Sequence, residues 1–216
     1  MRGLKHIQIL LGILISVLIV ACTPSFKLKW TKEEAPEYFT AKFETNKGVF
    51  EIESKKEWSP AGVNRLYQLI KNGYYTDMYI YRVIPGYVAQ FGLQNDTLSS
   101  SQWRKIKISD EPVLKNNTKG TVSFARGGSD TRSTILFINL ENNSPRLDTI
   151  NFNQVVGFPV VAQVISGMDV VASFYNGYGR ELDDKQTLIN EGGHTYLKKN
   201  YPKLDYIFKC QITSKK

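Results

Sequence analysis

The chain has 216 residues, of which 42% are hydrophobic and 22% are charged, and this is enough for one domain with a well-filled core. Its formal net charge of +8 comes from lysines spread singly along the chain. A nucleic-acid-binding surface would show a clustered basic stripe, so we expect no nucleic-acid partner. With two cysteines and two histidines, the chain is poorly suited to a Cys/His zinc site, and we expect no metal.

The N-terminal residues have the pattern of a cleaved targeting segment. Arg2 and Lys5 precede an apolar run that is too short for a confident membrane span and predicts a signal peptide over residues 1–21. Cys22 follows a small residue, and this segment resembles the lipobox of bacterial lipoproteins. That resemblance implies lipidation of Cys22 and a membrane-anchored lipoprotein of the bacterial cell envelope that faces the periplasm. An ordinary secretory signal with a chance cysteine is the alternative.

The first regular elements after this segment are a hairpin and a helix. Alternating residues over 38–45 and 49–53, separated by an Asn-Lys-Gly turn, predict two antiparallel strands. Ser59 and Pro60 then supply a cap and a first-turn proline. An apolar stripe at helical spacing follows, and Gly73 marks the end of the helix.

Residues 79–92 are the most informative part of the chain. The alternating first half predicts a strand, the Pro-Gly pair at 85–86 predicts a turn, and the apolar second half predicts another strand. If both strands belong to one sheet, Arg82 and Gln90 can share a face. That arrangement would place a permanent cation and an amide beside apolar side chains.

The second half of the chain adds further strands. They are predicted at 119–126, 135–140, 160–165 and 204–212, with a polar loop over 98–110 and a short helix over 168–174. In the last strand, Phe208 and Cys210 fall on one face, which makes Cys210 a buried free thiol. The element order favours a mainly β fold, a closed eight-stranded antiparallel barrel capped by two helices. This domain would span residues 40–213, and the polar residues 22–39 would tether it.

Several segments, in this order, resemble the cyclophilin-type peptidyl-prolyl isomerases. Residues 79–92 are Tyr-Ile-Tyr-Arg-Val-Ile-Pro-Gly-Tyr-Val-Ala-Gln-Phe-Gly and are similar to the family signature Phe-His-Arg-Val-Ile-Pro-Gly-Phe-Met-x-Gln-x-Gly. Further similar segments are residues 120–126, 136–139, 146–148, 164–171 and 196–207. The resemblance implies a cyclophilin-like barrel and a monomeric isomerase without a cofactor. Its substrates would be proline-containing segments of exported polypeptides.

The resemblance also assigns roles to particular residues. It implies that Arg82 and Gln90 are catalytic. It places Tyr87, Val88, Phe137, Leu147 and Phe158 in the wall of the substrate pocket, and Ala125 and Arg126 in the segment whose backbone pairs with the peptide. The residues alone leave two alternatives open, which are an exposed strand arginine at position 82 and simple core packing at the apolar positions.

Three positions depart from the family pattern. Ile135 replaces the usual glutamine before the strand at 136–139, and Arg146 replaces an aromatic residue. Phe158 replaces a histidine of the proline pocket. These changes leave a second function open, a peptide-binding or chaperone-like module with weak catalysis.

Other chemistries have little support in the sequence. Asp183 and Asp184 are adjacent carboxylates in a polar loop, and we expect both to be solvated. His194 lies near a predicted helix start, where a capping or surface role is expected. The Gly-Gly-Ser-Asp run at 127–130 lacks the lysine and the spacing of a phosphate-binding loop, and it predicts a turn.

Overall fold

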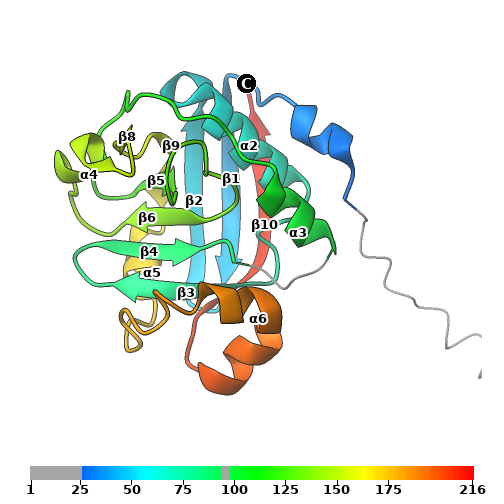
Figure 1. The fold of residues 1–216 in the computed structure, drawn as a ribbon, viewed down its shortest axis with the longest axis vertical. Helices are drawn as coiled ribbons and strands as arrows, with labels where there is room; N and C mark the ends of the chain where they lie inside the picture. Colours follow the sequence, from blue (N-terminus) through cyan, green and yellow to red (C-terminus); the bar gives the residue numbers. More distant parts are fainter. Residues whose placement is uncertain (1–25, 94–97) are drawn as a thin grey trace, which may run out of the picture.

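The computed structural model describes residues 26–93 and 98–216, so the predicted signal peptide and Cys22 lie outside it. Eight strands close into an antiparallel barrel in the order β1-β10-β3-β4-β6-β5-β9-β2 (Figure 1). Their bounds are β1 Tyr38–Thr45, β2 Gly48–Lys55, β3 Met78–Ile84, β4 Val88–Phe91, β5 Thr121–Phe124, β6 Leu136–Asn139, β9 Val160–Ser166 and β10 Tyr206–Lys215. The predicted barrel is confirmed. A separate two-stranded ribbon consists of β7 Asn151–Phe152 and β8 Val155–Val156.

The hairpin of β1 and β2 contributes one buried face to the barrel core. Side chains of β1 alternate between half-buried and fully buried along its whole length. Phe43 and Phe50 lie opposite each other in the register, and their rings stack with centroids 4.7 Å apart. Gly48 begins β2 at φ +131°, a conformation that glycine adopts without strain.

Helix α2, Pro60–Lys71, covers the barrel with its apolar stripe buried, as predicted. Its N-terminus is capped differently from the prediction, because the side chain of Ser59 makes no capping bond. The carboxylate of Glu111 accepts hydrogen bonds from the amides of Ala61 and Gly62 at 2.7 and 3.1 Å. A negative group from a distant loop therefore stabilises the positive end of this helix.

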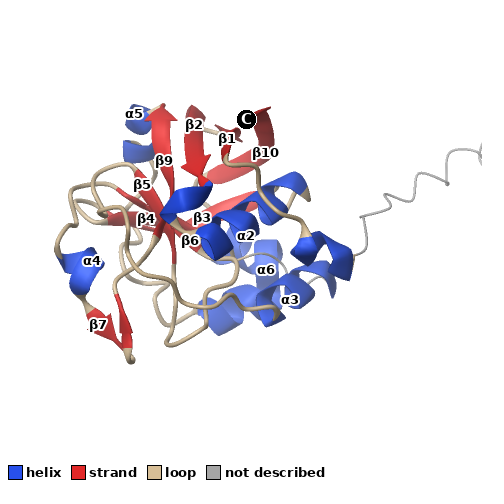
Figure 2. Cartoon of the chain, turned by 90° about the horizontal axis from the view of Figure 1, so that it is seen from above, coloured by secondary structure: helices blue, strands red, loops and turns tan. Residues whose placement is uncertain are grey.

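The barrel carries more helices than the two predicted (Figure 2). Besides α2 and the predicted short helix α5, Met168–Ala172, the described residues form η1 Leu28–Lys32, η2 Lys56–Trp58, α3 Leu98–Lys105, α4 Arg146–Thr149 and α6 Gln186–Asn200. The loop predicted at 98–110 is thus partly helical, because Trp103 anchors it in the core at 1% exposure. In the residues that the structure describes, no helix is both long and apolar enough to cross a membrane.

Part of the predicted tether is packed on the domain. Phe26 contacts Trp103 edge-to-face with ring centroids 5.2 Å apart, and Trp30 packs against the same core cluster. Ala35 is buried, and its amide donates to the side chain of Asn64 at 2.9 Å. These residues of the predicted tether therefore lie against the barrel.

Strand β10 contains a register shift that the sequence pattern does not reveal. Glu44 pairs with Lys209 and Thr45 pairs with Ile207, so Phe208 is an extra residue in β10. The shift turns Phe208 outward, at 51% exposure, while Ile207 and Cys210 are both buried. The prediction that Phe208 and Cys210 share a face is wrong, whereas the buried free thiol of Cys210 is confirmed.

Candidate active site

A row of side chains crosses neighbouring strands on the face that turns away from the main core. Arg82 pairs with Gln90, Gln90 with Phe137, and Phe137 with Ser123 in the register of β3, β4, β6 and β5. Residues directly opposite each other in antiparallel strands share a face, whereas sequence neighbours such as Ile138 point to the main core. The register therefore brings a cation, an amide and an aromatic ring side by side.

An apolar pocket lies beside this row. Val88, Phe137 and Leu147 form a buried cluster separate from the barrel core, and Tyr87, Ala125, Ile150 and Phe158 pack around it. The rings of Phe137 and Phe158 meet edge-to-face with centroids 5.5 Å apart. A cavity of about 800 Å³ extends over the pocket and over Arg82 and Gln90. The pocket-wall residues predicted from the sequence are thus together, and simple packing in the barrel core is excluded for Val88, Phe137 and Leu147.

The Arg82 guanidinium is held by two neighbours. Its Nη1 donates to Gln90 Oε1 at 3.1 Å, and its Nε donates to Asp183 Oδ1 at 2.5 Å. Gln90 is oriented in turn, because its Nε2 donates to the hydroxyl of Tyr81 at 2.6 Å. Burial raises the pKa of Tyr81 well above its usual value, so this hydroxyl stays protonated. The Arg82 side chain is 12% exposed, which excludes the alternative of an exposed strand arginine.

Asp183 is a site residue that the sequence analysis missed. Its carboxylate bridges Arg82 and the exposed Arg180, whose Nη1 lies 3.3 Å from Asp183 Oδ2. The prediction that Asp183 is merely solvated is therefore wrong. No local sequence signal could have identified it, because its partner Arg82 lies 101 positions away.

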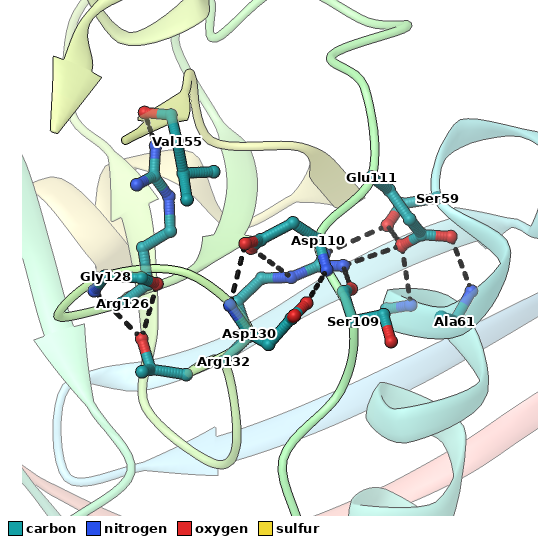
Figure 3. Close-up of polar contacts among 12 residues, drawn as sticks. Ser59, Ala61, Ser109, Asp110, Glu111, Arg126, Gly128, Asp130, Arg132 and Val155 are labelled. Carbon is teal, nitrogen blue, oxygen red and sulfur yellow. Dashed lines mark hydrogen bonds and ion pairs between the residues drawn. The ribbon is translucent and has the colours of Figure 1, made fainter. Parts of the chain in front are cut away.

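Arg126 has a structural role that the sequence did not suggest. Its buried guanidinium donates to the carbonyl of Val155 at 3.0 Å (Figure 3). It also donates to the carbonyl of Gly157 and lies 4.5 Å from the ring centroid of Phe158. These contacts hold Phe158 in the pocket wall. The amide of Ala125 donates to the carbonyl of Ile135 at 2.9 Å.

The loop after Arg126 is fixed by a polar network (Figure 3). Thr131 Oγ1 accepts hydrogen bonds from the amides of Gly127 and Gly128 at 2.9 and 3.0 Å. Asp110 and Asp130 each accept the other's amide at 2.7 Å. The predicted turn at 127–130 is confirmed, and this network keeps one wall of the cavity rigid.

Beneath this loop lies the buried ion pair of Arg132 and Glu111. Arg132 Nη2 is 2.9 Å from Glu111 Oε2, and the Arg132 side chain is fully buried. Burial raises the pKa of Glu111, but hydrogen bonds from Ser59, the α2 amides and Arg132 outweigh this and lower it overall. The carboxylate thus stays charged and joins α2 to the cavity wall.

All three departures from the family pattern lie at the cavity: Phe158 and Ile135 line it, and Arg146 borders it beside Tyr87. Ile135 is half-buried, lines the cavity, and packs against a second apolar cluster around Tyr81 and Leu93. Arg146 lies with its guanidinium 5.0 Å from the ring centroid of Tyr87. Arg82 is near the same ring, at 5.9 Å, so two cations flank the Tyr87 side of the pocket.

Known proteins with similar sequences decide the family. The family model described as "Cyclophilin type peptidyl-prolyl cis-trans isomerase/CLD" matches residues 40–190. The chain belongs to this family. This cyclophilin is accordingly a peptidyl-prolyl cis-trans isomerase, and proline-containing peptides are its substrate class.

Individual relatives agree with this assignment. Peptidyl-prolyl cis-trans isomerase B of Escherichia coli (strain K12) is 31% identical over 140 residues, which cover 60% of this chain and 79% of that protein. The isomerase of Acinetobacter baylyi is 30% identical over 135 residues, covering 61% and 69%. Among solved structures, a cyclophilin-type isomerase of Cryptosporidium parvum superposes with a TM-score of 0.55 at 15% identity, covering 83% of this chain and 99% of that one. This last likeness confirms the fold.

Proposed function

We propose that this cyclophilin isomerises X–Pro bonds in exported polypeptides at the bacterial cell envelope, with Arg82 and Gln90 as its catalytic residues. Uncatalysed isomerisation takes tens of seconds and has an activation energy of about 20 kcal/mol. No covalent bond breaks, so catalysis consists of favouring the twisted amide over the planar one. In the twisted state the prolyl nitrogen gains a lone pair, and a hydrogen-bond donor beside it lowers the barrier.

The observation that carries the proposal is the placement of Arg82 next to the apolar pocket. The cluster of Val88, Phe137 and Leu147 suits a proline ring, because it is apolar and lines the cavity. Two nitrogens of Arg82 are engaged by Gln90 and Asp183, which fixes the plane of the guanidinium. The N–H groups of Nη2 and the second N–H of Nη1 can then donate to the substrate.

A prolyl isomerisation assay on the purified protein tests the catalytic part of the proposal. We expect turnover of a tetrapeptide with a central Ala-Pro bond, and at least a tenfold loss of turnover in Arg82→Ala. The alternative, a peptide-binding module with weak catalysis, draws on Ile135, which supplies no amide to the cavity. Peptide binding without measurable turnover in the wild-type protein would favour that alternative.

The envelope location draws its support from the N-terminal sequence. Arg2, Lys5, the apolar run and Cys22 together match a lipoprotein signal. A single acyl chain binds membranes only marginally, so stable anchoring of a lipoprotein depends on several chains. Cys22→Ser is expected to release the protein from the membrane fraction or to leave its signal uncleaved. Unchanged fractionation of a correctly processed Cys22→Ser protein would exclude the lipid anchor.

A further inference from the structure

The cavity continues well beyond the apolar pocket. Its lining includes Ser133, Thr134, Ile135 and Phe137, so this segment of the chain runs along its wall. In an extended chain, alternate residues are about 7 Å apart, which puts Ser133 up to about 13 Å from Phe137. Phe137 belongs to the apolar pocket, whereas Ser133 marks a second end with a different character.

This second end is cationic. Lys107 Nζ lies 3.5 Å from Ser133 Oγ, and Arg104 lines the same part of the cavity wall. We call Arg104, Lys107 and Ser133 the cationic end. Across the whole cavity, the charged lining residues in the described part of the chain are five basic ones and one acidic one, namely Arg82, Arg104, Lys107, Arg126, Arg180 and Asp183.

A further positive charge lies beneath the cationic end. Arg65 is 2% exposed and donates to the carbonyls of Ile106, at 2.5 Å, and Ser133, at 3.4 Å. Burial lowers the pKa of Arg65 to about 10, and the side chain is therefore still charged at neutral pH. The pKa of Lys107 is lowered first by burial and then by the charges of Arg104 and Arg65. The three cations thus repel one another, and a bound anion would relieve this repulsion.

Asp183, the acidic residue of the lining, does not serve the cationic end. Its two oxygens are used by Arg82 and Arg180. The Asp183 carboxylate thus lies with Arg82 beside the apolar pocket, whereas Lys107 is exposed and lines the cavity.

From this distribution of charge we propose that the cationic end binds an acidic side chain of the substrate, so that the enzyme prefers peptides with glutamate or aspartate two to four residues from the isomerised proline. This inference rests on the proposed isomerase function of the apolar pocket. The spacing follows from the path along the wall, because an extended peptide covers about 13 Å in four residues. The proposal concerns substrate choice and adds no step to the isomerisation.

The test compares charged peptides on three forms of the full protein. Matched peptides carry glutamate, alanine or lysine at each position up to four residues on either side of an Ala-Pro bond, and kcat/KM is measured in low salt. We expect at least one position within this span to favour glutamate over lysine by about fivefold or more. Lys107→Glu is expected to abolish or invert that preference.

Lys105→Glu is the matched control, because Lys105 carries the same charge two positions away, is exposed, and does not line the cavity. It should keep the wild-type ratio between glutamate and lysine peptides. In 1 M salt the ratio should approach one, because the screening length falls to about 3 Å.

The possible outcomes distinguish a failure of the proposed charge preference from a failure of the proposed isomerase site. Turnover of the alanine peptides with no glutamate preference at any position would overturn the cationic end as a specificity site. An equal loss of preference in Lys105→Glu and Lys107→Glu would also overturn it, since overall charge would then be the cause. Absence of turnover with every peptide, in a folded wild-type protein, would instead refute the proposed isomerase site.

Discussion

Arg82 on strand β3 and Asp183 in the loop before α6 form an ion pair, with Nε and Oδ1 2.5 Å apart. The pair is largely shielded, because the side chain of Arg82 is 12% exposed and that of Asp183 is 34% exposed. A shielded carboxylate with good hydrogen-bond geometry restricts the guanidinium more than Gln90 alone could. Asp183 is thus placed to orient the proposed catalytic arginine.

Neutralising this carboxylate tests its positioning role. In Asp183→Asn the shape of the side chain is kept but the charge is lost, so we expect kcat to fall about threefold to tenfold, up to about 1.4 kcal/mol of barrier. KM should change by less. The adjacent, exposed Asp184 supplies the control, and Asp184→Asn should stay within about twofold of wild type. Faster turnover in Asp183→Asn would show that the carboxylate competes with the substrate for Arg82.

The arginine itself can be tested with a conservative pair of variants. Arg82→Lys keeps the positive charge but lacks the rigid fork that contacts Gln90 and Asp183 together. We expect both Arg82→Lys and Arg82→Ala to lower kcat at least tenfold, about 1.4 kcal/mol, while peptide affinity changes less. Circular dichroism must show a folded barrel in each. A folded Arg82→Ala protein with full activity would remove Arg82 from the mechanism.

The sequence predicted what depends on neighbours along the chain. Alternation identified the hairpin of β1 and β2, and the run at 79–92 placed Arg82 opposite Gln90, as the register confirms. The barrel followed from the number and order of strands. The two hairpins are each encoded in one short stretch of the chain, where side-chain period and turn chemistry are decisive.

What the sequence did not predict depends on contacts between distant segments. Asp183 reads as a solvated loop residue until the fold brings it to Arg82, and Glu111 caps α2 from 50 positions away. Phe208 fits an alternating strand until pairing with β1 forces an extra residue into β10. Segment 99–105 is polar apart from its anchor Trp103, so its composition favours a loop while tertiary packing makes it a helix.

The buried pair beneath the cavity wall predicts a stability effect. Glu111→Ala removes the nearest carboxylate from the fully buried Arg132 and leaves it Asp110, at 3.9 Å. Breaking a buried pair on one side costs about 3–5 kcal/mol, which we expect as a loss of unfolding free energy in urea. Glu57→Ala is the control, because Glu57 is exposed near the start of the same helix and should cost under about 0.5 kcal/mol. A loss in Glu111→Ala as small as that of the control would mean that the pair with Arg132 is energetically unimportant.

His194 predicts a pH-dependent stability. Contrary to the expected surface or capping role, it lies half-buried between Tyr79 and Tyr206, with ring centroids 5.2 and 5.9 Å away. Burial lowers its pKa below the usual value of about 6.5, while the charge of Asp77 acts weakly in the opposite direction. The neutral ring therefore stabilises the fold above pH of about 6.5, and this contribution is lost as the pH falls through the lower pKa of the folded state.

The measurement is the melting temperature at pH 7 and pH 5 for wild type and His194→Phe. Phenylalanine keeps the aromatic contacts with Tyr79 and Tyr206 but cannot be protonated. We expect the melting temperature to fall further between pH 7 and pH 5 in wild type than in the variant. Equal losses in the two proteins would show that His194 does not couple to stability in this range.

A substitution at Ile135 tests whether the loss of the family's glutamine from the cavity wall limits catalysis. Its half-buried side chain lines the cavity, so in Ile135→Gln the amide can reach the open space and hydrogen-bond with a substrate or with Gln90. We expect turnover to rise about threefold, because oriented polar groups in the site raise rate more than stability. The melting temperature should change little.

The same substitution three positions later is the matched control for Ile135. Ile138 lies on the opposite face of the same segment, in the barrel core at 1% exposure, where glutamine would bury unpaired polar atoms. Ile138→Gln should therefore destabilise the barrel by several kcal/mol, about 2–7 kcal/mol for an unpaired amide. If Ile135→Gln lost comparable stability without any gain in turnover, Ile135 would be packing rather than a limit on the site. The lower activity expected from its replacement of glutamine would then need another cause.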